Sequence, residues 1–512
     1  MLLAASSVAS ALIGLARGKY IAWVFGAGPQ TDAYMAAFRL PDLMNNFLVG
    51  GAVSITFVTI LNRYRESGQE DEGERVLFTV LNLMVLVLIA ASIVLMFFAA
   101  PFVRWTNPGF PAAQVDQCAQ MTRILLPAQI FLFAGSVLGS TLLIRKQFLY
   151  QAGTPILYNL SIIACGVLLH RKLGISSLAV GATLGFLFGS LAINAWGVAR
   201  AHIRFRWLID LRHPGLRLWL TMTLPLMFGF TLPFLDVYFA GYYASHGAGD
   251  ITRLANAKQI FSAPMAMLAQ AAGVASMPFF AQLWAKGERF QFASGVADSV
   301  SRVVALSFLA ASLMIALSQS IAGVIFGGGR FTPGDVNLTA WFFAIYTISL
   351  FAWSAQAIYA RAFYAAGITW LPMLASTIIL FAAFPLYGLG YKMWGASGLA
   401  LASDAGILLQ AVTLALLLHK RRMVSLAGLD LVEMARCLAA SAVAGCCAWA
   451  LVWGLRRAVH RLPGVASLHH TRWSDVAILV AGTLLWAAIA KLILDKSGSA
   501  LPRIALKKLR LV

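Results

Sequence analysis

Several charged side chains stand inside stretches of this chain that are otherwise apolar enough to lie in a membrane. Arg17, Lys19, Asp32 and Arg39 all fall within residues 15–42. A charge near the middle of a bilayer costs about 2.5–3.5 kcal/mol on insertion scales, so these positions indicate a function that offsets the cost. A guanidinium binds phosphate through two parallel hydrogen bonds and stays charged when partly desolvated. The residues therefore predict recognition of an anionic substrate.

A second group of charges lies in the corresponding region of the second half. Asp236, Arg253 and Lys258 occur there in apolar surroundings. If the first helices of the two halves face each other, both groups line one water-filled cleft that is cationic on balance. We predict five substrate-binding residues: Arg17, Asp32, Arg39, Lys258 and Lys19.

The elements that position these residues are membrane-spanning helices. The chain has 512 residues, of which 60% are hydrophobic and only 11% charged, whereas soluble domains are nearer 25% charged. Because a spanning helix needs about 20 apolar residues, we predict an all-α polytopic protein with about fourteen spans. Their expected ranges are 3–26, 31–61, 76–100, 119–144, 154–170, 175–199, 217–244, 251–284, 296–326, 338–364, 370–391, 396–418, 432–455 and 474–494.

An internal repeat organises these spans. "GAGPQT" (26–31) recurs as "GAGDIT" (247–252), and "SSLAVGATLG" (176–185) recurs as "SGLALASDAG" (397–406), both at an offset of 221 residues. We predict an N-lobe of six spans over 1–205, a C-lobe of six over 217–422, and two added spans in 430–512. Six spans return the chain to its starting side, so the repeat is parallel, and transporters are commonly built from such halves.

The basic charge follows membrane topology. The chain has a net charge of +20, and the loops after even-numbered spans carry most of its Lys and Arg. By the positive-inside rule both termini are cytoplasmic, and the excess reflects contact with anionic membrane lipids, so no nucleic acid is expected as a partner. The first apolar stretch lacks a basic n-region, so we expect no cleavable signal peptide.

The sequence motifs of common enzymes do not occur. The five cysteines form no CxxC pair, and there is no HExxH, P-loop or GxSxG motif, which argues against a zinc site, an ATPase and a serine hydrolase. We therefore expect a transporter that works as a monomer, not an enzyme.

The first charged stretch also resembles a known family. "VFGAGPQTDAYMAAFRLPDLM" (24–44) is similar to the signature of the MurJ (MviN) family of lipid II flippases, within the multidrug/oligosaccharidyl-lipid/polysaccharide exporter superfamily. Further similar stretches are "TNPGF" (106–110), "IFGGGRFTPGDV" (325–336), "ARAFYAAGIT" (360–369) and "ASGLALAS" (396–403). The resemblance implies a V-shaped two-lobe fold and a groove for a lipid tail in the last two spans.

The implied activity is movement of undecaprenyl-pyrophosphate-linked peptidoglycan precursor, lipid II, to the outer leaflet of the bacterial cytoplasmic membrane, for cell-wall synthesis. Arg17, Asp32 and Arg39 match family cavity positions. Ala11 and Gln259 stand where the family usually has Arg, which implies a less charged cavity. Lys258 compensates only in part, because one residue is about 100° around a helix.

Some members of the family bind sodium in the second lobe. Asp236 matches an acidic ligand position, and Asp404 offers another carboxylate. The polar positions expected in span 11 fall near Phe384 and Gly388, whose side chains cannot coordinate an ion. We therefore expect no cofactor, with Asp236 and Asp404 as the residues for any sodium ion, and transport driven by membrane potential.

Other functions stay open at this point. The same fold could export another polyprenyl-linked oligosaccharide, or a drug by cation-coupled antiport. A membrane glycosyltransferase or polymerase would need catalytic carboxylates in a large loop, and the longest loops here are short. A structural scaffold would not explain Arg17 and Arg39.

Overall fold

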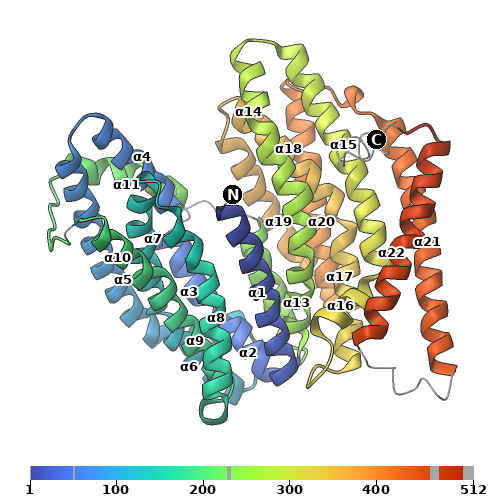
Figure 1. Cartoon of the computed structure of the whole chain (residues 1–512), viewed down its shortest axis with the longest axis horizontal. Helices are drawn as coiled ribbons and strands as arrows, with labels where there is room; N and C mark the ends of the chain where they lie inside the picture. The colour runs from blue at the N-terminus through green and yellow to red at the C-terminus, as the bar shows by residue number, and fades with distance from the viewer. Residues whose placement is uncertain (1, 50–51, 204, 228–231, 462–471, 500–512) are drawn as a thin grey trace. The chain divides into compact units, whose positions relative to one another are not determined.

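A computed structural model of the chain describes residues 2–49, 52–203, 205–227, 232–461 and 472–499 (Figure 1). All regular structure in these ranges is helical. The chain divides into two compact units, one formed by Met1–Gly229 with Ser245–Ile251, the other by Phe230–Ala244 with Thr252–Val512. The predicted domain boundaries at 205, 217 and 422 stay a prediction.

The helices of unit 1 come from the first part of the chain. They are α1 Leu2–Phe25, α2 Pro29–Ala37, α3 Arg39–Met44, α4 Ala52–Glu66, α5 Glu70–Thr106, α6 Ala112–Leu125, α7 Ala128–Ile144, α8 Phe148–Leu173, α9 Ser176–Phe186, α10 Ile193–Arg200 and α11 Pro214–Met227, with π-helical turns η1 Asn45–Val49 and η2 Leu187–Ala192.

The helices of unit 2 follow. They are α12 Leu232–Ala244, α13 Asp250–Pro264 with its first two residues in unit 1, α14 Ala271–Ala285, α15 Arg289–Ala316, α16 Ser318–Phe326, α17 Pro333–Ile348, α18 Leu350–Ala365, α19 Trp370–Trp394, α20 Ala396–Lys420, α21 Leu431–Arg461 and α22 Arg472–Lys496, with a π-helical turn η3 Met265–Gln270 and a 3₁₀ turn η4 Leu426–Gly428.

Ten helical segments of the described ranges are long and apolar enough to cross a membrane, and three of them join consecutive elements: α6 with α7, α9 with α10, and α13 with α14. The number is eleven if α17 and α18, bent by 42° at Ser349, form one span. The count of fourteen stays a prediction. Several predicted spans are not single helices: 31–61 is divided among α2, α3, η1 and α4, and 119–144 is broken between α6 and α7. The second break falls at Pro127, which has no backbone N–H to continue a helix.

Each unit has its own buried core. In unit 1, Phe57 on α4, Phe78 on α5, Phe133 on α7 and Trp219 on α11 are fully buried in one cluster. In unit 2 the largest buried cluster lies on α14, α15, α18, α19 and α20. The faces of α15 and α21 meet through small residues, including Ala305, Ala440 and Ala444, as expected where close packing replaces the hydrophobic effect.

The repeated sequences adopt matching local structure. α8 ends at Gly174, with φ 56° and ψ −135°, and α19 ends at Gly395, with φ 56° and ψ −139°. These positive φ angles favour glycine. The starts of α2 and α13, and of α9 and α20, are separated by about the offset of the sequence repeat. The axis relating the two halves stays a prediction.

The connection between α10 and α11 is not helical, yet it is held to the bundle. The side-chain amide of Asn82 donates to the carbonyl oxygens of Arg206 and Leu208, each at 3.0 Å, and the backbone N–H of Asp210 donates to Thr79 Oγ1 at 3.3 Å. We call residues 205–210 the α5 strap. Asn82 is buried, so its donors satisfy strap carbonyls that water would otherwise have to solvate.

Candidate functional site

Asp32 stands in the first turn of α2 and is only 1% exposed. Its Oδ2 accepts a hydrogen bond from the backbone N–H of Gly249 at 2.5 Å. A carboxylate in the first turn is also favoured by the helix dipole. A residue of α6 also holds this turn, because Gln114 Nε2 donates to Pro29 O at 2.9 Å. Asp32 therefore has a structural partner inside unit 1, a contact that the sequence did not indicate.

Arg39 begins α3 and is 3% exposed. Its Nη1 donates to Asn107 Oδ1 at 2.5 Å and to the carbonyl oxygen of Thr106 at 3.3 Å. Both acceptors lie at the C-terminal end of α5, where "TNPGF" begins. The guanidinium thus links α3 to the turn after α5, and its substrate-binding role stays a prediction.

Asn107 and Gly109 are functional candidates that sequence reasoning did not single out, although it quoted their motif. Asn107 Oδ1 accepts a hydrogen bond from the Arg39 guanidinium, and Asn107 Nδ2 donates to Thr106 Oγ1 at 3.0 Å. The N–H of Gly109 donates to Ser245 Oγ at 3.1 Å, and a Cβ on Gly109 would lie 2.5 Å from Ser245 O. Glycine is required there because another backbone approaches so closely.

Arg17 differs from Arg39 in its surroundings. It is half-buried on α1, and its guanidinium lies 5.8 Å from the ring centre of Tyr158 on α8. Its Nε is buried without a hydrogen-bond partner among the described residues. The guanidinium also interacts with the Tyr158 hydroxyl, and a half-buried cation of this kind can bind an anionic ligand through its more exposed nitrogens.

Lys19 is half-buried on the same helix. Two residues correspond to about 200° around a helix, so Lys19 leaves α1 on the side roughly opposite to Arg17. The two cations therefore do not converge directly on one point from α1. Ala11, where the family usually has Arg, is an exposed position of this helix.

Unit 2 gathers a separate group of charged side chains. Lys258 on α13 forms an ion pair with Asp236 on α12, and the hydroxyl of Tyr387 on α19 donates to the other carboxylate oxygen of Asp236. The Lys258 ammonium also lies 5.4 Å from the ring centre of Tyr346. Lys258 was predicted to bind substrate, and the structure places it with Asp236; the substrate role stays a prediction.

Asp404 on α20 completes this group. It lies close enough to Lys258 and Ser349 to interact with both, and its Oδ2 is buried without a hydrogen-bond partner in the described part of the chain. The structure thus brings the two expected cation ligands, Asp236 and Asp404, near the same lysine. The residues that join them, Tyr346, Tyr387 and Ser349, carried no sequence signal.

Arg253 has a structural partner in unit 2. Its Nη2 and Nε both reach Asp335 Oδ1, at 2.7 and 2.8 Å. Asp335 is part of the capping box of α17, in which its N–H donates to Thr332 Oγ1 at 3.2 Å. Arg253 therefore fixes α13 to the start of α17.

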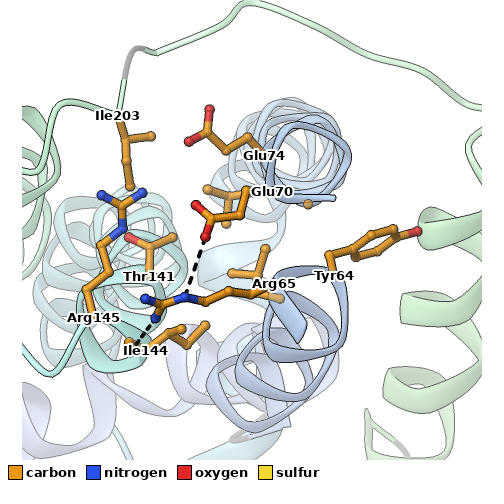
Figure 2. Close-up of a pocket in the computed structure, with 11 residues that line it drawn as sticks. Tyr64, Arg65, Glu70, Glu74, Thr141, Ile144, Arg145 and Ile203 are labelled. Carbon is orange, nitrogen blue, oxygen red and sulfur yellow. Dashed lines mark hydrogen bonds and ion pairs between the residues drawn. The ribbon is translucent and has the colours of Figure 1, made fainter. Parts of the chain in front are cut away.

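A pocket in unit 1 lies between the ends of α4 and α7 and the start of α5 (Figure 2). It is partly open to solvent, and its empty space, including the open part, is about 460 Å³. Arg65 spans it, with Nε 3.5 Å from Glu70 Oε1 and Nη1 donating to Ile144 O at 3.2 Å. Arg145 donates to Ala201 O at 2.8 Å. Because both arginines already have protein acceptors, they hold the helix ends together. The pocket therefore offers few hydrogen-bond donors to an anionic ligand.

Comparison with known proteins gives a consistent result. The model of the family "Lipid II flippase MurJ" matches residues 21–465. The probable lipid II flippase MurJ of Vibrio cholerae is 24% identical over 94% of this chain and 95% of its own length. The lipid II flippase MurJ of Burkholderia cenocepacia is 28% identical over 80% of this chain and 81% of its own.

Solved structures share the fold. A lipid II flippase MurJ in an inward closed conformation matches with a TM-score of 0.77 and 19% identity, over 97% of this chain and 99% of that one. An inward-facing multidrug resistance MATE transporter of the MOP superfamily matches with a TM-score of 0.65 and 15% identity, over 80% of this chain and 94% of that one.

Proposed function

The chain belongs to the lipid II flippase MurJ family, and we propose that it moves lipid II from the inner to the outer leaflet of the bacterial cytoplasmic membrane by alternating access. The observation that carries this proposal is the extent of the family match, which runs through both units. Its many apolar helices agree with a multi-pass membrane protein. We place both termini in the cytoplasm and take the protein to act as a monomer, a transporter without a catalytic step.

Arg17 is the residue we assign to the pyrophosphate of the substrate. Two observations support this choice: Arg17 is only half-buried and lies against the ring of Tyr158, whereas Arg39 and Arg253 donate hydrogen bonds to protein oxygens. Hydrogen bonds from a guanidinium to an anion are about twice as strong as neutral ones. We expect Arg17 to hold the substrate headgroup, with Asp32 and Arg39 stabilising the helices around it.

The two last helices are the part we assign to the lipid tail. α21 and α22 are anchored to the rest of unit 2 by two polar contacts: Trp486 Nε1 donates to Ser312 Oγ at 3.0 Å, and Arg456 Nη2 donates to Ser320 Oγ at 3.0 Å. Arg456 Nη2 also joins α21 to α22, by donating to Asp475 Oδ1 at 2.8 Å. α21 carries the exposed side chains of Trp449 and Trp453. An apolar face of this kind suits a long polyprenyl chain.

The test is reconstitution of the purified full-length chain in proteoliposomes with lipid II. We expect translocation by the natural protein, loss of translocation in Arg17→Ala, and partial activity in Arg17→Lys, which keeps the charge but loses the planar fork. Arg171→Ala, which removes an exposed arginine from the end of α8, is the matched control and should be fully active.

The alternatives give different outcomes in the same assay. Another polyprenyl-pyrophosphate glycan moved faster than lipid II would indicate a different cargo. Transport of a cationic drug in exchange for protons or sodium, without lipid II movement, would indicate a multidrug antiporter. Rescue of cells depleted of their lipid II flippase by the natural chain, but not by Arg17→Ala, would support the proposal independently.

A further inference from the structure

The carboxylate of Asp236 is the starting point, because both of its oxygens are already occupied. One forms the ion pair with Lys258 and the other accepts from the hydroxyl of Tyr387. The Asp236 side chain is 3% exposed and that of Lys258 is 30% exposed. A buried carboxylate requires a counter-charge, and here the chain itself provides it.

The sodium site that the family resemblance implies does not fit these residues. Phe384, at one expected ligand position, packs against Phe239, with ring centres 4.8 Å apart, and against Tyr243 at 6.0 Å. At the other position, a Cβ on Gly388 would lie 2.7 Å from the hydroxyl of Tyr243. Aromatic side chains thus occupy the space beside both positions, and neither position itself carries an oxygen ligand in its side chain. Within the described residues, no group of three His, Cys, Asp or Glu side chains could hold a metal ion.

We propose that the ammonium group of Lys258 is the permanent counter-cation of unit 2 and takes the place of a bound sodium ion. An ammonium carries the same single charge as sodium and has three donors that can satisfy oxygens around it. The ring of Tyr346 adds a favourable face for a cation. Asp404, with one unpartnered buried oxygen, provides a second negative group near the same nitrogen.

The consequence concerns energy coupling and goes beyond the proposed cargo. A sodium ion can leave its site and be replaced from either side of the membrane, whereas a lysine side chain cannot leave its helix. Lys258 therefore neutralises the charge of Asp236 without exchanging an ion with the solution. This inference does not depend on which lipid is transported, because it describes a site inside unit 2.

The experiment measures the apparent melting temperature of the purified full-length protein in detergent. Each protein is measured in sodium chloride and in choline chloride at equal ionic strength. For the natural chain we expect the same value in both salts. Lys258→Met keeps the length of the side chain but removes its charge, and we expect its melting temperature to fall by about 5 °C in choline chloride.

Sodium should then restore part of that loss. In Lys258→Met the oxygens of Asp236, Asp404 and Tyr387 are left around the vacated position, so a saturable rise in melting temperature with sodium, and not with choline, is expected. Lys286→Met, which removes an exposed lysine of unit 2, is the matched control and should show neither effect. The double variant Lys258→Met/Asp236→Asn, which removes both charges, should regain stability and lose the response to sodium.

Two outcomes would overturn the inference. A saturable stabilisation of the natural chain by sodium, abolished by Asp236→Asn, would show that sodium binds despite Lys258; this measurement does not require the lysine variant to fold. If neither the natural chain nor Lys258→Met responds to sodium, Lys258 does not occupy an ion's place. Neither melting-temperature measurement depends on lipid II transport. The proposal about Lys258 can therefore be wrong while the proposed function is right, and the reverse.

Discussion

Replacing Arg39 with alanine should reduce the stability of unit 1, and we expect this to be its main effect, larger than any direct effect on substrate binding. The guanidinium is 3% exposed and donates to Asn107 Oδ1 at 2.5 Å and Thr106 O at 3.3 Å. A hydrogen bond to a charged group contributes about 1.5–3 kcal/mol, and leaving a buried acceptor without a partner costs about 1–3 kcal/mol. With one strong bond and one weak bond lost, we expect Arg39→Ala to reduce the free energy of unfolding by about 3–4 kcal/mol.

The assay combines stability and transport. Unfolding in mixed detergent and denaturant gives the loss of stability, and proteoliposomes give lipid II movement per folded molecule. Asn107→Ala removes the acceptor, so the double variant Arg39→Ala/Asn107→Ala should lose less than the sum of the single changes, with a coupling of about 1–3 kcal/mol. Arg123→Ala, which removes an exposed arginine that donates to Met96 O at 3.1 Å, is the matched control and should change little.

The reasoning would be refuted by a stable but inactive protein. If Arg39→Ala unfolds like the natural chain and moves no lipid II, the guanidinium acts on the substrate and its contact with Asn107 adds nothing to the fold. If the two single changes are strictly additive, the hydrogen bond between Arg39 and Asn107 does not contribute in solution.

Three further predictions concern the α5 strap, the last two helices and the driving force of transport. Asn82→Ala leaves the carbonyls of Arg206 and Leu208 without their donor, so amide hydrogen exchange in the α5 strap should accelerate and stability should fall by about 1–3 kcal/mol; unchanged exchange would mean that Asn82 does not hold the strap. Deleting residues 431–512 should leave a folded protein that moves a short-chain analogue of lipid II better than the full-length lipid; equal rates for both in proteoliposomes would remove the tail-binding role of α21 and α22. Because each substrate charge crossing the full field gains about 2.3 kcal/mol per 100 mV, transport should follow an imposed membrane potential and ignore a sodium gradient; activity that follows sodium at zero potential would contradict this.

The sequence was sufficient for the family and the helical class, because both depend on local patterns. Each apolar run, and the stretch from Val24 to Met44, consists of residues that are neighbours in the sequence. The family match confirms the family that this stretch indicated. Helix breaks were harder to predict. The stretch 31–61 was predicted as one span with a kink or break at Pro41, whereas the structure interrupts the α-helix earlier, at Phe38, and again at the π-helical turn η1.

The partners of the charged residues could not be predicted, because they come from distant parts of the chain. Arg39 meets Asn107, 68 residues away, and Asp236 meets Tyr387, 151 residues away. A single sequence shows that a buried cation needs a counterpart but not which residue provides it. The expectation about Phe384 and Gly388 needed only side-chain chemistry, and the structure adds the aromatic packing around them.

The α5 strap also limits where the chain tolerates engineering. By sequence, the connection between α10 and α11 looks like a natural place to insert a tag, since it joins two halves and carries several charges. Its backbone is nevertheless bonded to α5 at Asn82 and Thr79, so a residue inserted between Arg206 and Asp210 would break one or more of these hydrogen bonds. Insertions tolerate exposed backbone with few hydrogen bonds. A fluorescent or affinity label attached to the exposed side chain at position 286, beside the turn at Gly287, leaves the backbone hydrogen bonds of the chain in place.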